Sequence, residues 1–442
     1  MAWTEADAEA ELLGRELFGM RFGLERMHRL TTALGMPQRR FAQVHVVGSN
    51  GKSSTTRFVA ALLERHGLAT GAYVSPHLRR FRERIEVGEE PISAERFATA
   101  VQRAIEAAEL VERAAPEGDE RVTQFELSTA AAFHALAVGG VDVAVIEAGL
   151  GGRFDATNVI PSRVTVLTGV GLEHTRWLGP TVADIAGEKL AVLRDHTTLV
   201  VPSDLDPDAV AVAERAAAER HARLVVADPA PLSAPHARDA DISDGMRREG
   251  PPRPRPRGEM RALGAFQRRN FALACAATEA FLGRALDPDA VAAAAAQTRV
   301  PGRMEVVADD PLTIYDGAHN PAGAAALAEA LGEVLGERSP VVAVVSVLDD
   351  KDAADMLAPL LAVADRLVAT RCANPRALPP GTLATLAAQL GHRDAEIVAD
   401  PRRAVERARE LAGRDGAVVA TGSIYLIADL VREAADARAS SL

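Results

Sequence analysis

Lysine is almost absent from this sequence. Lysine and arginine together number 50 in 442 residues, but only Lys52, Lys189 and Lys351 are lysines. Arginine serves equally well as a surface charge, whereas it cannot replace a compact ammonium ion or provide a neutral amine. The three lysines are therefore candidates for specific chemistry, the alternative being that they are random remnants of a biased composition.

Other scarce features exclude whole classes of protein. Two cysteines, Cys275 and Cys372, cannot build a disulfide framework, which favours the cytoplasm. No stretch approaches about 20 uninterrupted apolar residues, so we expect no membrane span. The N-terminal segment carries acids and arginines and lacks an apolar run, so we expect no secretory signal. A net charge of −11 argues against a general nucleic-acid binder.

The remaining composition is that of a globular protein, with 48% hydrophobic and 25% charged residues. The length suits two or three domains. Apolar runs alternate with helical patterns, which predicts a doubly wound, mainly parallel α/β sheet. Prolines and arginines interrupt the alternation over residues 229–260, where we expect an irregular segment. A Pro-Gly turn places the boundary between a first domain, 1–298, and a smaller α/β domain, 299–442.

The strongest motif is VHVVGSNGKSST at residues 44–55. An expected strand leads into a glycine-flanked loop that carries Lys52, and an expected helix follows. The amides of such a loop and helix N-terminus bind phosphate, and the lysine neutralises it. The spacing departs from G-x-x-x-x-G-K-[ST], because Val46 stands in place of the first glycine. The motif predicts a P-loop-like nucleotide site, the alternative being a βα turn with a chance lysine.

Further motifs place polar residues after expected strands, at the edge where α/β sheets hold ligands. Glu147 ends a strand within VDVAVIEAGLGGRFDATN, and a carboxylate beside a phosphate loop is a natural Mg²⁺ ligand. His174 in GLEHTRWLG follows another strand, and Lys189 lies on the next helix. Ser75 begins SPHLRRFRERI, where it is placed to hold a metal ion or a metal-bound water. Each of these residues also has a structural alternative, such as a cap for Glu147.

The segment after Ser75 also carries arginines, among which Arg82 and Arg84 are candidates for receiving an anionic substrate. Thr123 opens an expected helix and could simply be its N-cap. In the C-terminal half, Asp316 and His319 lie in YDGAHNPAG between a strand and a helix. Asp316 is placed to accept from ribose hydroxyls, and His319 to contact phosphate or a reacting carboxylate.

The third lysine, Lys351, follows an expected strand within LDDKD, and TGSIY closes the last strand at residues 421–425. Lys52 and Lys351 thus follow strand ends directly, and Lys189 lies on a helix after one. Random remnants would rarely be placed in this way.

Together these motifs resemble the folylpolyglutamate synthase/dihydrofolate synthase family, the folate branch of the Mur ligase superfamily. The shared motifs, in chain order, are GSNGKSS, SPHL, F-x-E-R-I, T-x-F-E, E-A-G-L-G-G-R-F-D-A-T-N, G-L-E-H-T, Q-x-x-N at 267–270, P-G-R at 301–303, D-G-A-H-N and G-S-x-Y. They extend from about residue 20 to residue 430. The resemblance implies a P-loop NTPase-like domain and a smaller Rossmann-like domain. It also implies an ATP-dependent ligase that adds L-glutamate to a dihydropteroate or folate carboxylate through an acyl phosphate.

The resemblance also implies roles for individual residues. The ATP phosphates would be bound by Gly48, Ser49, Asn50, Gly51, Lys52, Ser53 and Ser54, and the nucleotide also by Asn270, Arg303 and Asp316. Two magnesium ions would be held by Ser75, Glu147 and His174, with a carbamylated Lys189 completing a site. The pterin-bearing substrate would lie near Met20, Arg21, Phe22, Thr123 and Phe154, with Arg84 as a further candidate, and the glutamate near His319, Lys351, Ser423 and Tyr425.

The sequence departs from the family at particular positions. Ser53 stands where a glycine usually follows the loop lysine, and Glu173 replaces a common aspartate. LAV follows Lys189 where the family has AGI, which changes the packing around the lysine. No family motif matches residues 229–260.

Three other functions remain open at the level of sequence. A peptidoglycan Mur ligase or cyanophycin-type ligase usually has a nucleotide-sugar domain before the P-loop, and we expect no room for one here. A P-loop ATPase used as a switch explains GSNGKSS and Glu147, but not Lys189, DGAHN and GSIY together. A paralogue with another acceptor is the third. We expect a cytoplasmic monomer that acts on small molecules and has neither nucleic acid nor membrane as a partner.

Overall fold

The computed structural model describes residues 3–15, 23–115, 121–228, 237–239, 260–392 and 394–433. The chain divides into two compact units. The first comprises Met1–His77, Phe81–Glu259 and Arg269–Thr298, and the second comprises Leu78–Arg80, Met260–Arg268 and Arg299–Leu442. Two short earlier segments therefore belong to the second unit, which the sequence did not indicate. Among the described helices, none is long and apolar enough to cross a membrane.

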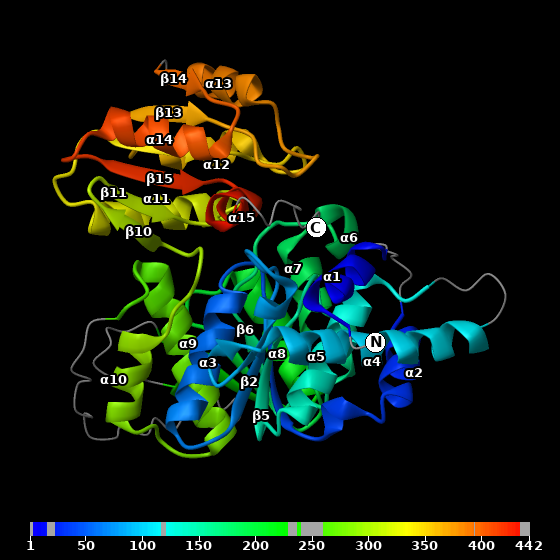
Figure 1. Cartoon of the computed structure of the whole chain (residues 1–442). Helices are drawn as coiled ribbons and strands as arrows, with labels where there is room; N and C mark the ends of the chain where they lie inside the picture. The colour runs from blue at the N-terminus through cyan, green and yellow to red at the C-terminus, as the bar shows by residue number, and fades with distance from the viewer. Residues whose placement is uncertain are drawn as a thin grey trace. The chain divides into compact units, whose positions relative to one another are not determined.

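In its described residues, the first unit contains a nine-stranded sheet with the order β4-β3-β2-β5-β1-β6-β7-β8-β9 (Figure 1). The strands are β1 (Ala42–Val47), β2 (Thr70–Tyr73), β3 (Ile85–Val87), β4 (Glu90–Pro91), β5 (Val143–Glu147), β6 (Val164–Leu167), β7 (Thr198–Pro202), β8 (Arg223–Ala227) and β9 (Ala237–Asp239). The neighbours from β2 to β8 pair in parallel, while β3 and β9 are antiparallel to the strands beside them. The predicted doubly wound, mainly parallel sheet is confirmed.

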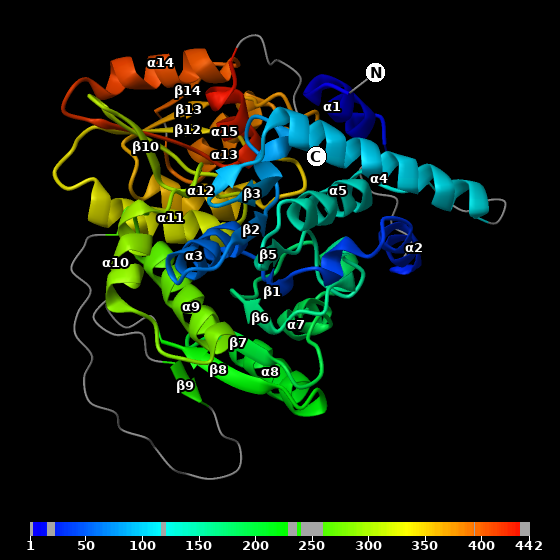
Figure 2. The ribbon, with the colours of Figure 1, turned by 60° about the horizontal axis from the view of Figure 1, so that its bottom comes forward.

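Helices cover both faces of this sheet, because its central strands are apolar on both sides. Three helices, α3 (Lys52–Arg65), α9 (Ala265–Leu282) and α10 (Pro288–Gln297), gather on one side, and α4 (Ala94–Ala114) and α5 (Gln124–Val138) lie on the other (Figure 2). α1 (Glu5–Leu13) and α2 (Glu25–Ala33) pack into the core of α4 and α5. A separate core joins α7 (Val182–Leu190) and α8 (Pro207–Glu219) to β6 and β7. The short helix α6 (Thr175–Leu178) precedes α7.

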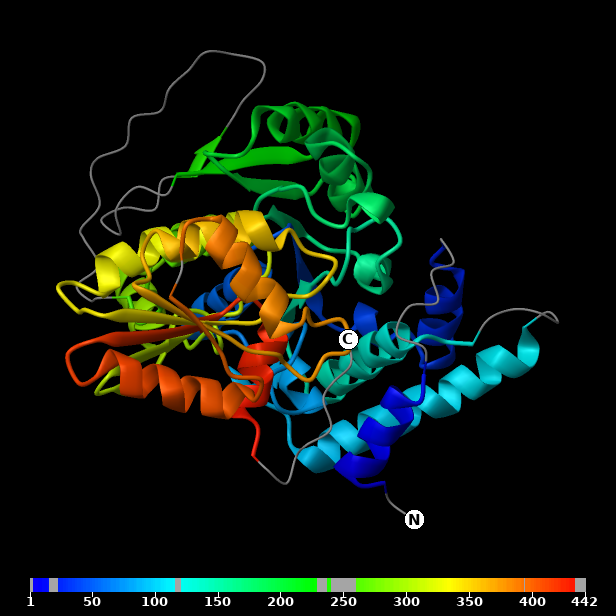
Figure 3. The same cartoon turned by 90° about the horizontal axis from the view of Figure 1, so that it is seen from above.

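The described part of the second unit contains a six-stranded sheet with the order β10-β11-β15-β12-β13-β14. Its strands are β10 (Glu305–Asp309), β11 (Leu312–Tyr315), β12 (Val341–Val345), β13 (Arg366–Ala369), β14 (Ala395–Ile397) and β15 (Ala417–Thr421), and all except β10 are parallel. One face packs against α11 (Pro321–Val334), α12 (Ala353–Leu361) and α13 (Pro380–Gln389). The other packs against α14 (Pro401–Ala412) and α15 (Ile424–Val431) (Figure 3).

Short polar side chains set the starts of several helices. Ser93 caps α4 by accepting from the Arg96 N–H. Thr123 caps α5 and forms a capping box with Glu126, so the N-cap interpretation of Thr123 is confirmed. The hairpin of β3 and β4 was not predicted, because its strands are too short to show an apolar alternation. Within residues 229–260, the structure describes only β9 and Met260.

The packing of α3 against α9 generates a test of the first unit's core. The rings of Phe58 and Phe271 meet edge to face with centroids 5.3 Å apart, and both are buried. We expect Phe58→Ala to lower the free energy of unfolding of this unit by about 3–5 kcal/mol. Both tryptophans, Trp3 and Trp177, belong to the first unit, so fluorescence during urea unfolding reports on it. Phe154→Ala, at a half-exposed position, is the control, and an equal loss in both variants would contradict the expectation.

Candidate functional site

Four neighbouring parallel strands of the first unit end at one edge of its sheet. The strand order β2-β5-β1-β6 brings together the segments that follow each strand, and Val46 of β1 pairs with Glu147 of β5. Ser75 follows β2, residues 48–54 follow β1, and Thr168 follows β6. Ligands of open α/β sheets bind at this edge. The structure thus brings the predicted phosphate loop beside the predicted metal ligands Ser75 and Glu147.

The phosphate loop requires glycine at two positions. Gly48 has φ 148° and Gly51 has φ 84°, conformations that side chains disfavour. A Cβ on Gly48 would lie 2.0 Å from Thr168 Oγ1, and one on Gly51 would lie 2.4 Å from Asn270 Oδ1. Asn270, a predicted nucleotide contact, is therefore packed directly against the loop. α3 begins immediately after Gly51, so its N-terminal amides complete an anion-binding loop.

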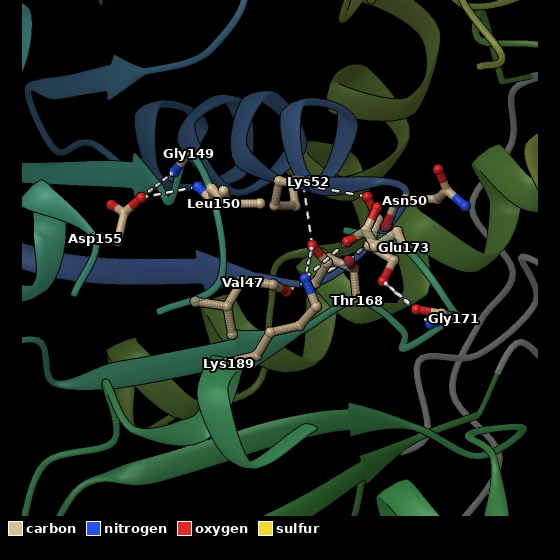
Figure 4. A network of polar contacts seen from close by, with 12 residues as sticks. Val47, Asn50, Lys52, Gly149, Leu150, Asp155, Thr168, Gly171, Glu173 and Lys189 are labelled. Carbon is tan, nitrogen blue, oxygen red and sulfur yellow. Dashed lines mark hydrogen bonds and ion pairs between the residues drawn. The ribbon is translucent and has the colours of Figure 1, made fainter. Parts of the chain in front are cut away.

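Two of the three lysines converge on this loop (Figure 4). Lys52 Nζ donates to the carbonyl oxygens of Gly48 and Ser49 at 2.9 and 3.1 Å. Lys189 Nζ, which comes from α7, donates to the same Gly48 oxygen at 2.9 Å and to Glu173 Oε1 at 2.9 Å. Lys52 and Lys189 therefore lie together at the predicted phosphate loop, and their specific chemistry stays a prediction.

In the buried pair of Lys189 and Glu173, the surroundings favour the charged form of the acid but not that of the base. Burial acts to raise the pKa of Glu173, but attraction to Lys189 and Lys52 outweighs it and lowers the pKa to about 2. For Lys189, burial lowers the pKa, and repulsion by Lys52 adds to this effect against the attraction of Glu173. Glu173 is thus ionised throughout the neutral range, while the ammonium form of Lys189 is less favoured than that of an exposed lysine.

Glu147 is the buried carboxylate of the site, with 2% of its surface exposed. Its Oε1 accepts from the Ser53 hydroxyl at 3.0 Å, and its Oε2 accepts from the Ser75 backbone N–H at 3.1 Å. Burial raises the pKa of Glu147, and the Lys52 ammonium opposes that rise. A divalent cation would offset the cost of burying this charge, and the oxygen atoms around Glu147 suit Mg²⁺ or Mn²⁺.

The other predicted metal ligands are arranged differently. Ser75 contacts Glu147 through its backbone rather than its hydroxyl. His174 is exposed at the start of α6 with φ 48°, and its neighbour Glu173 is the side chain that faces Lys189. Across the described ranges, no three His, Cys, Asp or Glu side chains gather at metal-binding spacing. The protein side chains at this edge therefore supply only part of a cation's coordination shell.

A buried hydrogen-bonded chain fixes the glycine-rich loop after Glu147. Asp155 Oδ2 accepts from the backbone N–H groups of Gly149 and Leu150, each at 2.9 Å. Asp155 Oδ1 accepts the Thr157 hydroxyl at 2.5 Å, and that hydroxyl lies 2.8 Å from His45 Nε2. Because the single Thr157 proton is donated to Asp155, His45 must donate from Nε2. The strand before the phosphate loop is thereby tied to the loop after Glu147.

His45 and Thr157 were not identified from the sequence. The available signal was a histidine within the apolar run of β1, which could equally have been a satisfied core residue. In the structure His45 is fully buried, and burial, with a smaller effect of Arg194, lowers its pKa to about 3. The imidazole therefore acts as a neutral hydrogen-bond donor.

The predicted substrate residues of the first unit have varied surroundings. Arg84 is 1% exposed, donates to His77 Nδ1 at 3.0 Å and lies over the Phe81 ring. Phe154 is 44% exposed on the loop after Glu147. Thr123 is buried in its capping box. Met20, Arg21 and Phe22 lie outside the described residues.

In the second unit, Asp316 follows β11 and is buried. Its two oxygens accept from the backbone N–H groups of Met304 and Ala318 at 2.9 and 2.8 Å. Burial raises the pKa of Asp316, and attraction to Arg303 opposes the rise. Asp316 thus holds the turn that contains Arg303 against the DGAHN loop, and the two predicted nucleotide contacts lie together.

The other predicted residues of the second unit follow the same strand ends. His319 Nδ1 lies 2.9 Å from the Gly317 carbonyl oxygen, so Nδ1 donates its proton to that oxygen. Ser423 caps α15 by accepting from the Tyr425 N–H at 3.2 Å. Lys351 pairs with its neighbour Asp350 at 3.0 Å. Because β11, β15 and β12 are parallel neighbours, these residues share one edge of the second sheet.

Comparison with known proteins decides the family. Residues 302–424 match the glutamate ligase domain of Mur ligases. A dihydrofolate synthase/folylpolyglutamate synthase from Mycobacterium tuberculosis is 37% identical over 392 residues, which cover 83% of this chain and 77% of the relative. This chain belongs to the folylpolyglutamate synthase/dihydrofolate synthase family. It is accordingly an ATP-dependent ligase that joins glutamate to a folate-type carboxylate, and the ATPase-switch alternative is excluded.

Solved structures agree with this assignment. The folylpolyglutamate synthase of M. tuberculosis complexed with ADP superposes with a TM-score of 0.83 at 31% identity, covering 96% of both chains. A folylpolyglutamate synthase/dihydrofolate synthase from Yersinia pestis, complexed with AMPPNP and a Mn ion, gives a TM-score of 0.80 at 28% identity and covers 96% of this chain and 97% of its own. The two-domain α/β fold predicted from the resemblance is that of the family.

The buried histidine of this synthase provides a test of the chain that holds the glycine-rich loop. His45 has a folded pKa of about 3 and an ordinary value of 6.5, so the unfolded chain takes up a proton first as the pH falls. The resulting loss of stability is absent above pH 6.5 and grows between 6.5 and 3. From pH 7.5 to 5.5, we expect wild type to lose about 1.4 kcal/mol more than His45→Gln in urea unfolding. His28→Gln, at an exposed position, should behave like wild type, and equal losses in all three proteins would refute the assignment.

Proposed function

We propose that the loop from Gly48 to Ser54 binds the phosphates of ATP in this chain. The proposal rests on the strand-loop-helix geometry, in which Lys52 Nζ and the N-terminus of α3 surround one short loop. Lys52 donates to loop carbonyl oxygens here, and phosphate oxygens would compete for those donors. ADP in the M. tuberculosis relative supports the same ligand.

We further propose that Glu147 holds a divalent cation beside this loop, with Ser75 and His174 contributing and a second ion close by. Two observations support this proposal. Glu147 is a buried carboxylate near the oxygen atoms of Ser53 and Ser75, and the Y. pestis relative binds a Mn ion. When bound, the cation would neutralise charge on the phosphates during transfer. Lys52 supplies further neutralisation from the protein itself.

Lys189 is proposed to be carbamylated in the working enzyme. Carbamylation requires a neutral amine, and burial together with Lys52 favours that form of Lys189. The modification would turn a cation into an anion at the Gly48 carbonyl, so the contact with Glu173 would have to break. The aliphatic stem of Lys189 is held in α7, which would keep a carbamate next to the loop.

The reaction follows from the chemistry of two carboxylates. The acceptor carboxylate attacks the terminal phosphate of ATP, and ADP leaves while an acyl phosphate forms. The ammonium group of glutamate must first lose a proton, and we propose that His319 receives it at Nε2, because Nδ1 is engaged with the Gly317 carbonyl oxygen. The amine then attacks the acyl carbon, and phosphate leaves with the second proton of the nitrogen as the amide forms. Loop amides and Lys52 hold the phosphate oxygens throughout.

The two substrates have separate proposed binding regions. We propose that the pterin-bearing acceptor lies near Phe154, whose ring is exposed, and that Ser423, Tyr425 and Lys351 contribute to the glutamate site. ADP release should be measured with Mg²⁺, ATP and glutamate in the presence of dihydropteroate, tetrahydrofolate or no acceptor. ADP release that requires both glutamate and one of the pterins identifies the acceptor. ADP release that depends on neither contradicts the proposal.

We also propose that the protein is a monomer, which sedimentation would test.

Removal of either charged side chain beside the phosphate loop, Lys52 or Glu147, should abolish most of the turnover. We expect Lys52→Ala and Glu147→Ala to reduce glutamate-dependent ADP release by about 100-fold or more, because each removes charge stabilisation of the transferred phosphoryl group. Urea unfolding should show that both variants remain folded. Arg103→Ala, on the exposed face of α4, serves as the control. Near-normal turnover in either site variant would show that the site has been assigned wrongly.

The state of Lys189 can be measured directly. With ¹³C-labelled bicarbonate, wild type should give a carbamate carbon signal that Lys189→Arg lacks, because a guanidinium cannot form a carbamate. Lys189→Arg should also lose about tenfold or more in turnover, because arginine cannot carry the modification and is too wide for both contacts of Lys189. A wild-type spectrum without the signal, at saturating bicarbonate and nucleotide, would rule the carbamate out.

A further inference from the structure

Ser53 makes a contact that a glycine could not make. It stands directly after Lys52, where the family usually has glycine, and it belongs to the first turn of α3. Its Oγ lies 3.0 Å from Glu147 Oε1 and 3.4 Å from the Ser75 carbonyl oxygen. The hydroxyl therefore links the helix that follows the phosphate loop to the ends of two neighbouring strands.

We propose that Ser53 is a positioning residue for the divalent cation, acting through Glu147. Its hydroxyl fixes the Glu147 carboxylate in the orientation in which the carboxylate receives the cation beside the phosphate loop. The inference rests on the proposed function, in which Glu147 is a cation ligand. It assigns a role to the serine that distinguishes this chain's loop from the usual glycine form.

The hydrogen-bond geometry fixes the carboxylate from two sides. The Ser53 hydroxyl has one proton, and the shorter of its two contacts, 3.0 against 3.4 Å, directs that proton to Glu147 Oε1. The Ser75 N–H donates to the other oxygen, Oε2, at 3.1 Å. Rotation of the carboxylate about its terminal bond would break both hydrogen bonds. With 2% of Glu147 exposed, water is poorly placed to replace them.

The same geometry leaves acceptor capacity where a cation needs it. Each carboxylate oxygen can accept more than one contact, so one hydrogen bond to Oε1 and one to Oε2 do not exhaust Glu147. Carboxylate oxygens are hard ligands of the kind that Mg²⁺ and Mn²⁺ prefer. Partners that orient a ligating side chain commonly contribute 10–100-fold to metal affinity.

The test measures Mn²⁺ binding to the full chain by the electron paramagnetic resonance signal of free Mn²⁺, with and without ADP. We expect Ser53→Ala to weaken binding by about tenfold or more. Ser53→Thr keeps the hydroxyl and should stay within about threefold of wild type. Ser203→Ala, at an exposed serine after β7, controls for loss of a hydroxyl elsewhere.

Steady-state kinetics provide an independent measurement. If Ser53 acts by orienting Glu147, Ser53→Ala should need about tenfold more Mg²⁺ for half-maximal rate. A structural defect would instead lower the rate at every Mg²⁺ concentration without changing the Mg²⁺ concentration for half-maximal rate. Thermal unfolding without metal shows whether each variant is folded.

The outcomes separate this inference from the proposed function. Wild-type Mn²⁺ affinity in Ser53→Ala overturns the inference, and so does a Ser53→Thr variant as weak as Ser53→Ala. Glu147→Ala tests the cation site separately from the role of Ser53. If Glu147→Ala binds Mn²⁺ like wild type, the proposed cation site itself is wrong. If Glu147→Ala binds weakly while Ser53→Ala is unchanged, the cation site stands and only the role of Ser53 fails.

Discussion

The carbonyl oxygen of Gly48 accepts hydrogen bonds from two ammonium groups, and the nucleotide loop depends on this convergence. Lys52 approaches from α3 and Lys189 from α7, each at 2.9 Å. A backbone carbonyl held by two cations cannot rotate without losing both hydrogen bonds, so the two lysines fix the peptide group that follows Gly48. The glycine conformation at Gly48 makes the arrangement possible, because a side chain there would collide with Thr168.

The two buried carboxylates near the loop, Glu173 and Glu147, differ in how much positive charge the protein places beside them. Glu173 has Lys189 at ion-pair distance, and its pKa falls to about 2 despite burial. Glu147 has a hydroxyl and a backbone N–H as its hydrogen-bond donors, and burial raises its pKa. The first carboxylate is therefore neutralised by the protein and the second only partly. A divalent cation would supply the missing positive charge at Glu147.

The sequence predicted what depends on local pattern and missed what depends on contacts between distant segments. Apolar runs predicted the parallel strands, and residues placed after those strands, such as Glu147 and Asp316, do lie at the strand-end edges of their sheets. The hydrogen-bonded chain from His45 through Thr157 to Asp155 was not predictable, because His45 and Thr157 are 112 positions apart in the sequence. The assignment of Leu78–Arg80 to the second unit likewise depends on tertiary packing. Residues 20–22 lie outside the described ranges, so their predicted role stays a prediction.

The structure gives a physical reason for lysine rather than arginine at position 189 and none at position 351. At Lys189 a compact ammonium fits between a carbonyl and a carboxylate, each at 2.9 Å, in a site with 1% exposure. A planar guanidinium, which is wider and directs its N–H groups in a fixed fork, would not fit both contacts. Lys351 pairs with the adjacent Asp350, a contact that arginine could also make. A role for Lys351 therefore rests on its position after β12, and any requirement for lysine there must come from the substrate.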